Sequence, residues 1–107
     1  MSGIFQRFFS LHGKAALITG ASGGIGSTLA AALAEAGAAV ALNGLTAGKL
    51  EAAKHRIDAV GGSAVILRQD IQTVENCREL IATAQAKLGR LDILVNCAGV
   101  NRRKPGP

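Results

Sequence analysis

Short apolar runs alternate with amphipathic stretches along most of the 107-residue chain. The apolar runs fall at residues 15–18, 38–42, 64–67 and 91–95, and the stretches between them carry apolar residues at helical spacing. Strands that are apolar throughout are typical of a parallel sheet covered on both faces. The pattern therefore predicts an α/β fold of the Rossmann type, β-α-β-α-β-α-β and doubly wound. Right-handed crossovers give it the strand order 3-2-1-4.

Glycine and threonine residues mark the ends of the predicted helices. Gly37 ends a first helix, in which Ile25, Leu29 and Leu33 recur every four residues. Thr46 is expected to cap a second helix over residues 47–60, and Thr73 a third that ends at Gly89. The inner faces are predicted to carry Leu50, Ala53, Ile57 and Val60 in the second helix, and Val74, Cys77, Ile81, Ala84 and Leu88 in the third.

A glycine-rich turn over residues 19–26 joins the first predicted strand to the first helix. Strand, tight turn and helix form the context that a phosphate-binding loop requires. Gly20 lets the chain leave the strand sharply, Gly24 lets the backbone approach a pyrophosphate, and Gly26 removes a Cβ where the helix crosses the sheet. The N–H groups at the start of the helix then face the anion. Residues 96–99, after the fourth strand, arrive at the same edge of the sheet, so both stretches indicate one site.

Composition and charge argue against a disordered protein, a membrane protein and a nucleic-acid-binding protein. A hydrophobic content of 49% argues against disorder, and no apolar run approaches the length of a membrane span. With no secretory signal in view, we expect a cytoplasmic protein that does not bind a membrane. The net charge of +5 comes largely from Arg102, Arg103 and Lys104, and the chain has no Trp or Tyr to stack on bases, so we expect no nucleic-acid binding. Cys77 and Cys97 are expected to be core thiols.

Three segments are expected. Residues 1–12 form a prefix that packs on the domain and contains Phe5, Phe8 and Phe9. Residues 13–100 form a partial dinucleotide-binding domain, and residues 101–107 form a basic tail.

Three motifs together resemble the short-chain dehydrogenase/reductase family. They are the turn at residues 13–26, Asp70 after the third strand, and residues 91–99, where Cys97 replaces the second asparagine of an Asn-Asn-Ala-Gly segment. The resemblance implies an adenine contact by Asp70, and it covers nearly the whole chain. The cofactor-binding residues it implies, together with the glycine turn, are Gly20, Ser22, Gly23, Gly24, Ile25, Gly26, Asn43, Thr46, Asp70, Ile71, Asn96, Ala98 and Gly99.

The end of the second strand bears on the choice of cofactor. NAD enzymes place an acid there for the ribose 2′-hydroxyl, and residues 43–46 contain none. NADP enzymes usually offer an arginine there or in the glycine turn, yet Leu45 and Gly23 stand at those places. Asn43 and Thr46 offer hydrogen bonds to a 2′-phosphate, which favours NADP over NAD.

The resemblance also implies hydride transfer between the cofactor and an alcohol or ketone, by a serine and a Tyr-x-x-x-Lys pair. The chain has no tyrosine, so it looks like the truncated N-terminal half of a reductase, itself inactive, whose parent forms homo-oligomers. Within the family it resembles gluconate 5-dehydrogenase-like members, which act on a sugar acid, and 3-oxoacyl-carrier-protein reductases. A non-catalytic nucleotide-binding half-domain remains the alternative.

Overall fold

A computed structural model of the chain describes residues 10–97. The expectations for Phe5, Phe8 and Phe9, for Ala98 and Gly99, and for the tail of residues 101–107 lie outside the described residues. Of the predicted prefix, Leu11 packs against the core, and its N–H donates to the carbonyl oxygen of Ala36 at 2.8 Å.

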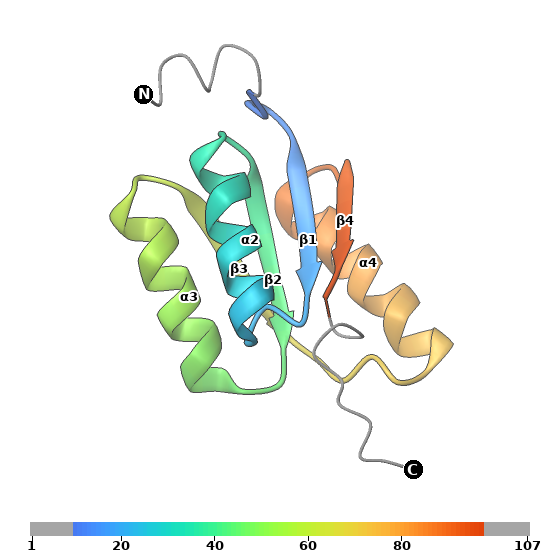
Figure 1. Ribbon diagram of the computed structural model, residues 1–107. Helices are drawn as coiled ribbons and strands as arrows, with labels where there is room; N and C mark the ends of the chain where they lie inside the picture. The colour runs from blue at the N-terminus through green and yellow to red at the C-terminus, as the bar shows by residue number, and fades with distance from the viewer. Residues whose placement is uncertain (1–9, 98–107) are drawn as a thin grey trace.

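Four parallel strands form one sheet in the order β3-β2-β1-β4, as predicted (Figure 1). The chain alternates strictly between strand and helix, which confirms the doubly wound α/β class. The elements are β1 (Ala15–Thr19), α2 (Gly24–Glu35), β2 (Ala39–Gly44), α3 (Ala47–Ala59), β3 (Ser63–Arg68), α4 (Val74–Leu88) and β4 (Ile93–Asn96).

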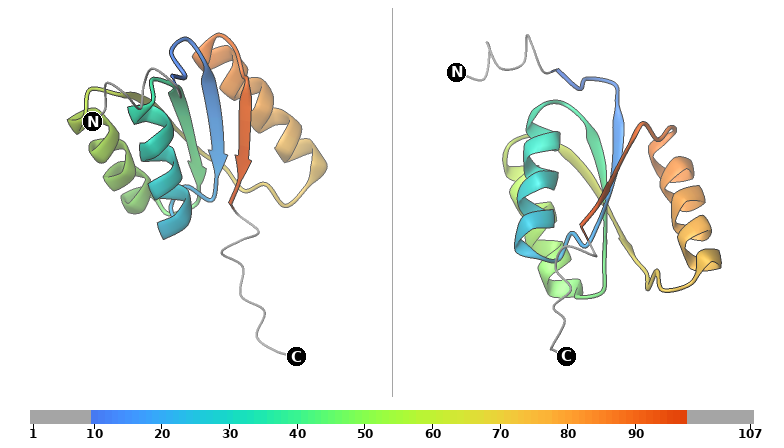
Figure 2. Two further views of the ribbon diagram at one scale, coloured as in Figure 1. Left: turned by 45° about the horizontal axis from the view of Figure 1, so that its top comes forward. Right: turned by 45° about the vertical axis from the view of Figure 1, so that its right-hand side comes forward.

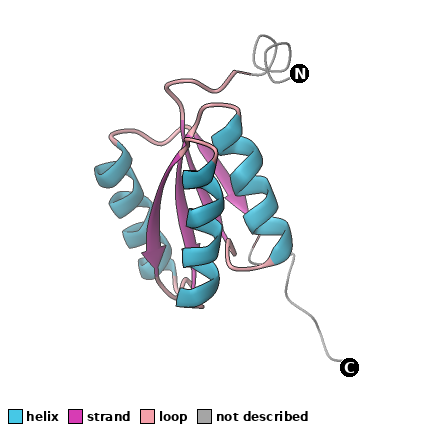
Figure 3. Cartoon of the chain, turned by 90° about the vertical axis from the view of Figure 1, so that its left-hand side faces the viewer, coloured by secondary structure: helices cyan, strands magenta, loops and turns pink. Residues whose placement is uncertain are grey.

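The helices enclose the sheet from both sides. α2 and α3 cover one face and α4 the other (Figure 2), so the strands run between helices (Figure 3). Neighbouring residues of β1 serve opposite faces, since Ile18 belongs to the cluster under α2 and α3, and Leu17 to the cluster under α4. Both side chains are fully buried. This two-sided burial explains why β1 is apolar at every position from Ala15 to Ile18.

The buried side of α2 differs from the apolar repeat of its sequence. Gly26, Ala30 and Ala34 face the core, whereas the side chains of Ile25 and Leu29 are 50% and 40% exposed. Small residues let the helix axis approach the sheet closely. Of the predicted repeat, Leu33 packs against the core, whereas Ile25 and Leu29 are turned outward.

The inner faces of the other helices are confirmed in part. Leu50, Ala53 and Ile57 of α3 are buried as predicted, but Val60 is the C-terminal cap residue and is 56% exposed. In α4 the buried residues are Leu80 and Ala84, while Val74 is 63% exposed and Ile81 36% exposed. Of the predicted face, Ala84 is therefore confirmed, and Cys77 and Leu88 are half-buried. Leu80 takes the buried place that was expected of Ile81.

The predicted helix ends are mostly confirmed. The Thr73 hydroxyl accepts a hydrogen bond from the Asn76 N–H at 3.1 Å, and Gly89 ends α4 with a φ of +85°. Thr46 does occupy the cap position of α3, but its side chain makes no capping bond.

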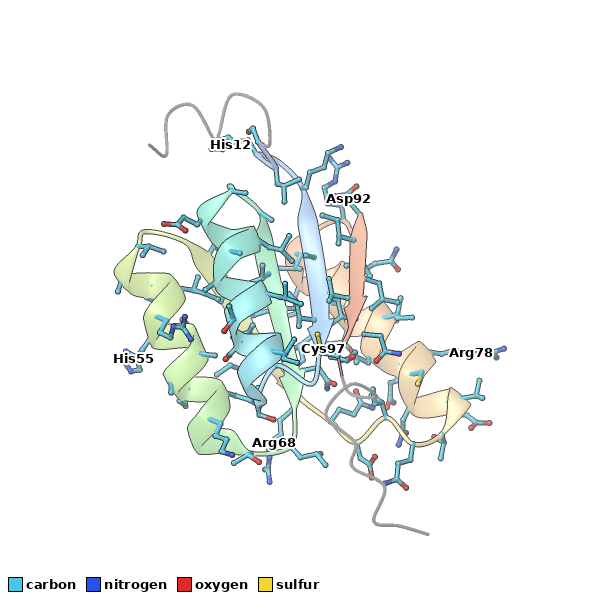
Figure 4. All side chains as sticks on the ribbon, viewed as in Figure 1. His12, His55, Arg68, Arg78, Asp92 and Cys97 are labelled. Carbon is cyan, nitrogen blue, oxygen red and sulfur yellow. The ribbon has the colours of Figure 1, made fainter. Side chains whose placement is uncertain are left out.

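A charged pair fixes β4 beside β1 (Figure 4). Asp92 accepts hydrogen bonds from Arg90 through both carboxylate oxygens at 2.8 Å, and one of these oxygens also accepts from the Ala15 N–H at 2.9 Å. The bond from Arg90, and then the bond from Ala15, lower the pKa of Asp92, and the Asp92 carboxylate raises the pKa of Arg90.

Candidate dinucleotide-binding site

The carboxyl ends of the four strands meet at one edge of the sheet, the lower edge in Figure 1. Thr19 lies opposite Asn96 in the β1–β4 pairing, and Gly44 lies opposite Arg68 in the β2–β3 pairing. The glycine turn follows Thr19 directly. In open parallel sheets this edge is where ligands bind, at the point where the strand order reverses.

Three glycines of the turn meet three different demands. Gly20 has a φ of +68°, a conformation that favours glycine. A Cβ on Gly26 would collide with the Gly20 carbonyl group, 2.8 Å from its carbon, so the helix is seated on the turn itself. A Cβ on Gly24 would meet nothing within 4 Å among residues 10–97. This part of the chain therefore leaves open space where the Cβ of Gly24 would project, and a ligand can approach the backbone there.

The first turn of α2 presents backbone donors. Gly23 is the cap residue and provides no side-chain cap, and within residues 10–97 the N–H groups of Gly24, Ile25 and Gly26 have no acceptor. These donors carry the positive end of the helix dipole. Beside them lies a shallow groove of about 320 Å³ between α2 and α3, lined by Ser22, Gly23, Gly24, Ser27, Lys49, Ala52, Ala53 and Arg56.

The turn is fixed against the end of β2. The Ala21 N–H donates to the Asn43 carbonyl oxygen at 2.8 Å. A Cβ on Gly44 would lie 2.9 Å from Ser22 Oγ and 3.1 Å from Leu50 Cδ2. Position 44 therefore has little room for a side chain, the acid of NAD enzymes included.

The side chain of Asn43 is buried and hydrogen-bonds to the backbone at the end of β3. This side chain is 2% exposed, and its amide nitrogen donates to the carbonyl oxygens of Leu67 at 2.9 Å and Gln69 at 3.1 Å. Both amide hydrogens are used to join β2 to the end of β3, so the expected contact to a 2′-phosphate does not fit this side chain. Thr46, by contrast, is exposed at the start of α3.

The loop after β3 carries Asp70 and Ile71. Asp70 is exposed, and its Oδ1 accepts from the Gln72 N–H at 3.1 Å, which fixes the loop and leaves Oδ2 without a partner among residues 10–97. Ile71 is half-buried, and its carbonyl accepts from Cys77 Sγ at 3.3 Å. The Ile71 side chain lines a small apolar cavity of about 100 Å³ between α4 and the sheet, together with Leu17, Thr19, Cys77, Leu80, Ile81, Leu94 and Asn96.

Thr19 joins the ends of β1 and β4. Its hydroxyl is 2.7 Å from Asn96 Oδ1, and its carbonyl accepts from the Cys97 N–H at 3.1 Å. Cys97 is 2% exposed and packs in the core under α2, so the cysteine that replaces an asparagine is a core thiol as predicted, and Cys77 is also free. Thr19 was not among the predicted site residues. Its position at the carboxyl end of the first predicted strand could have indicated that it lies at the site.

Sequence reasoning also missed the cations that line the groove or contact the turn after β2. Lys49 and Arg56 line the groove, and Arg68 Nε donates to the Leu45 carbonyl oxygen at 2.8 Å. The position of Arg68 could have been predicted from the sequence. It ends the third strand, and the last residues of neighbouring parallel strands lie side by side. No group of three or more His, Cys, Asp or Glu residues within residues 10–97 is arranged to hold a metal, and no helix there is long and apolar enough to cross a membrane.

A family model described as short chain dehydrogenase matches residues 14–106. A gluconate 5-dehydrogenase of Gluconobacter oxydans (strain 621H) is 43% identical over 97 residues, which are 91% of this chain and 38% of that protein. The crystal structure of a dehydrogenase/reductase from Sinorhizobium meliloti 1021 is similar with a TM-score of 0.82 at 41% identity, over 88% of this chain and 38% of the other. The crystal structure of a 3-oxoacyl (acyl-carrier-protein) reductase from Agrobacterium tumefaciens C58, with NADP bound, is similar with a TM-score of 0.76 at 42% identity. The similarity covers 83% of this chain and 34% of the other. The chain thus spans less than two fifths of the length of these relatives.

Proposed function

The chain belongs to the short-chain dehydrogenase family, and we propose on this basis that its 107 residues bind a nicotinamide adenine dinucleotide at the carboxyl edge of the sheet. The observation that carries the proposal is the backbone at Gly24. Within the described part of the chain, a Cβ there would meet nothing within 4 Å, and the N–H groups of Gly24, Ile25 and Gly26 have no acceptor. An anion such as a pyrophosphate satisfies these donors.

The remaining residues of the edge fit the rest of the ligand. We assign the pyrophosphate to the backbone of residues 22–26, and the adenosine to the space between the turn after β2 and the loop after β3. Asp70 offers an adenine amino group the carboxylate oxygen that has no partner among residues 10–97, and Ile71 offers an apolar wall. Asn96, held by Thr19, is assigned to the nicotinamide side, with Ala98 and Gly99, which lie outside the described residues.

NADP is the cofactor that we propose in preference to NAD. Gly44 and the serine packed on it leave little room for the carboxylate that binds a ribose 2′-hydroxyl. The charged side chains that border the groove and the turn after β2, namely Lys49, Arg56 and Arg68, are cations. The similar acyl-carrier-protein reductase is described with NADP bound.

For a protein that spans the full length of the relatives, we propose hydride transfer between the cofactor and an alcohol or ketone. The bound nicotinamide supplies or accepts the hydride. These 107 residues contain no tyrosine, so their own part in the reaction is to bind and orient the cofactor. The similarity to gluconate 5-dehydrogenase makes a sugar acid the first substrate to test, and an acyl-carrier-protein thioester the second.

The test is a fluorescence titration of the chain with NADPH. Gly24→Val places a branched side chain where the pyrophosphate must approach, and we expect the affinity to fall about tenfold or more. The matched control is Gly48→Val in α3, since a Cβ on Gly48 also meets nothing within 4 Å. Unchanged affinity in Gly24→Val, or equal losses in both variants, would remove the glycine turn from the site.

The lack of any tyrosine also favours a second candidate, a nucleotide-binding unit that performs no hydride transfer. This unit and the reductase share the cofactor site and differ in the coding sequence beyond residue 107. A Tyr-x-x-x-Lys motif there, in frame or after a frameshift, supports the reductase, whereas a stop codon followed by unrelated sequence supports the second candidate.

A further inference from the structure

The turn between β2 and α3 lacks a cation of its own. Its outermost residue is Leu45, an apolar side chain that is 55% exposed. The amide nitrogen of Asn43 already donates both of its hydrogens to the carbonyl oxygens of Leu67 and Gln69, and Gly44 has no side chain. A 2′-phosphate at this turn would therefore find only the Thr46 hydroxyl among the side chains of residues 43–46.

A guanidinium from the neighbouring strand reaches this turn. Arg68 is the last residue of β3 and lies opposite Gly44 in the sheet register. Its Nε donates to the Leu45 carbonyl oxygen at 2.8 Å, which fixes the plane of the guanidinium beside the turn (Figure 4). Its two terminal nitrogens have no partner within residues 10–97.

We propose that Arg68 determines cofactor specificity in this chain by pairing with the 2′-phosphate of NADP through these two nitrogens. The inference rests on the proposed function and names the residue that selects between the two dinucleotides. A guanidinium offers a planar, bidentate fork to a phosphate, and here one of its nitrogens is already anchored to the backbone. The anchoring bond reduces the freedom that the long side chain loses on binding.

Lys49 and Arg56 are the rival cations. Both line the groove between α2 and α3, beside Ser22 and Gly23. Neither has a hydrogen bond or ion pair within the described residues, so nothing holds their charges at the turn. Arg68 alone among the three has a bond to a residue of the turn.

The experiment compares the binding of the adenosine half of NADP with that of the adenosine half of NAD to the 107-residue chain. Adenosine 2′,5′-bisphosphate and 5′-AMP differ only in the 2′-phosphate, and isothermal titration gives the affinity ratio between them. We expect the wild type to bind the bisphosphate about tenfold or more tightly, as a charge-assisted bidentate contact provides. Arg68→Met should bring the ratio close to one and leave the affinity for 5′-AMP unchanged.

Three further variants test the assignment. Arg78→Met removes an equal charge from an exposed position on α4, on the opposite face of the sheet, and should keep the wild-type ratio (Figure 4). Lys49→Met should also keep it. Adding Leu45→Arg to Arg68→Met supplies a guanidinium from the turn itself and should restore the ratio. Circular dichroism of each variant checks the fold.

The outcomes separate this inference from the proposed function. If both probes bind and Arg68→Met keeps the wild-type ratio, or Lys49→Met alone abolishes it, Arg68 is not the specificity residue and cofactor binding stands. A wild type that prefers 5′-AMP also overturns the inference. If neither probe binds the folded chain, the proposed function fails, and this inference fails with it.

Discussion

Gly26→Ala tests how tightly α2 is seated on the glycine turn. The new methyl group would lie against the carbonyl oxygen of Gly20 and 2.8 Å from its carbonyl carbon. Both contacting atoms belong to the backbone of a turn that also pairs with β2 through Ala21. No flexible side chain is available to move aside, so either the helix or the turn must shift.

The expected magnitude follows from two opposing effects. Overpacking of this kind costs about 3 kcal/mol, the upper part of the usual range, because backbone must move. Alanine regains about 1 kcal/mol of helix propensity over glycine. The net loss of about 2 kcal/mol corresponds to a fall in Tm of about 8–16 °C for a domain of this size.

Gly24→Ala is the matched control, since it is the same substitution two residues earlier in the same helical turn. Its methyl group enters open space, so we expect Tm to stay level or to rise by about 2–4 °C, from a gain of about 0.5 kcal/mol. The NADPH affinity of Gly24→Ala should nevertheless fall, because the methyl group occupies the space where the pyrophosphate approaches, although Tm shows that the fold is intact. Thermal melts by circular dichroism and NADPH titrations of both variants measure the two effects. A Gly26→Ala variant that melts with the wild type would refute the tight seating of α2.

Two further predictions concern β4. The lowered pKa of Asp92 means that its stabilising effect is complete above its unfolded pKa and is lost as the pH falls through the folded value, below about pH 4. Urea unfolding at several acidic pH values should therefore show a shallower loss of stability in Asp92→Asn, and an unchanged pH slope would contradict the role of the Arg90–Asp92 pair. Within the described residues β4 pairs only with β1, and Leu94 is 55% exposed, so we expect the 107-residue chain to self-associate and Leu94→Lys to reduce this association in sedimentation velocity. A wild type that sediments as a monomer at all concentrations would contradict that expectation.

The strand order and the glycine turn were predictable because they depend on patterns of the chain that few structures satisfy. Four apolar runs separated by helical stretches favour a parallel sheet with crossovers of one hand. Gly20, which has a positive φ, and Gly26, which has no room for a Cβ, then stand in the turn between a predicted strand and a predicted helix. Such constraints are local, and the sequence displays them directly.

The inner faces of the helices were less predictable, because apolar residues are also placed where they are not buried. α2 turns Gly26, Ala30 and Ala34 inward and leaves Ile25 and Leu29 exposed, the reverse of what hydrophobicity alone indicates. Close approach of the helix to the sheet decides this orientation, and only the packed structure reveals how close that approach is.

Asn43 and Arg68 show why the polar side chains of the site were hardest to assign. Both stand at strand ends, where a polar residue can serve either the fold or a ligand. The buried amide of Asn43 is used by two carbonyl groups of the β3 end, whereas the guanidinium of Arg68 is held at one nitrogen and open at the other two. The sequence places the two residues 25 positions apart, and their different roles depend on the register of the folded sheet. The register sets Gly44 beside Arg68, so the Arg68 guanidinium reaches the Leu45 carbonyl oxygen at the surface, whereas the amide of Asn43 is buried between the strand ends.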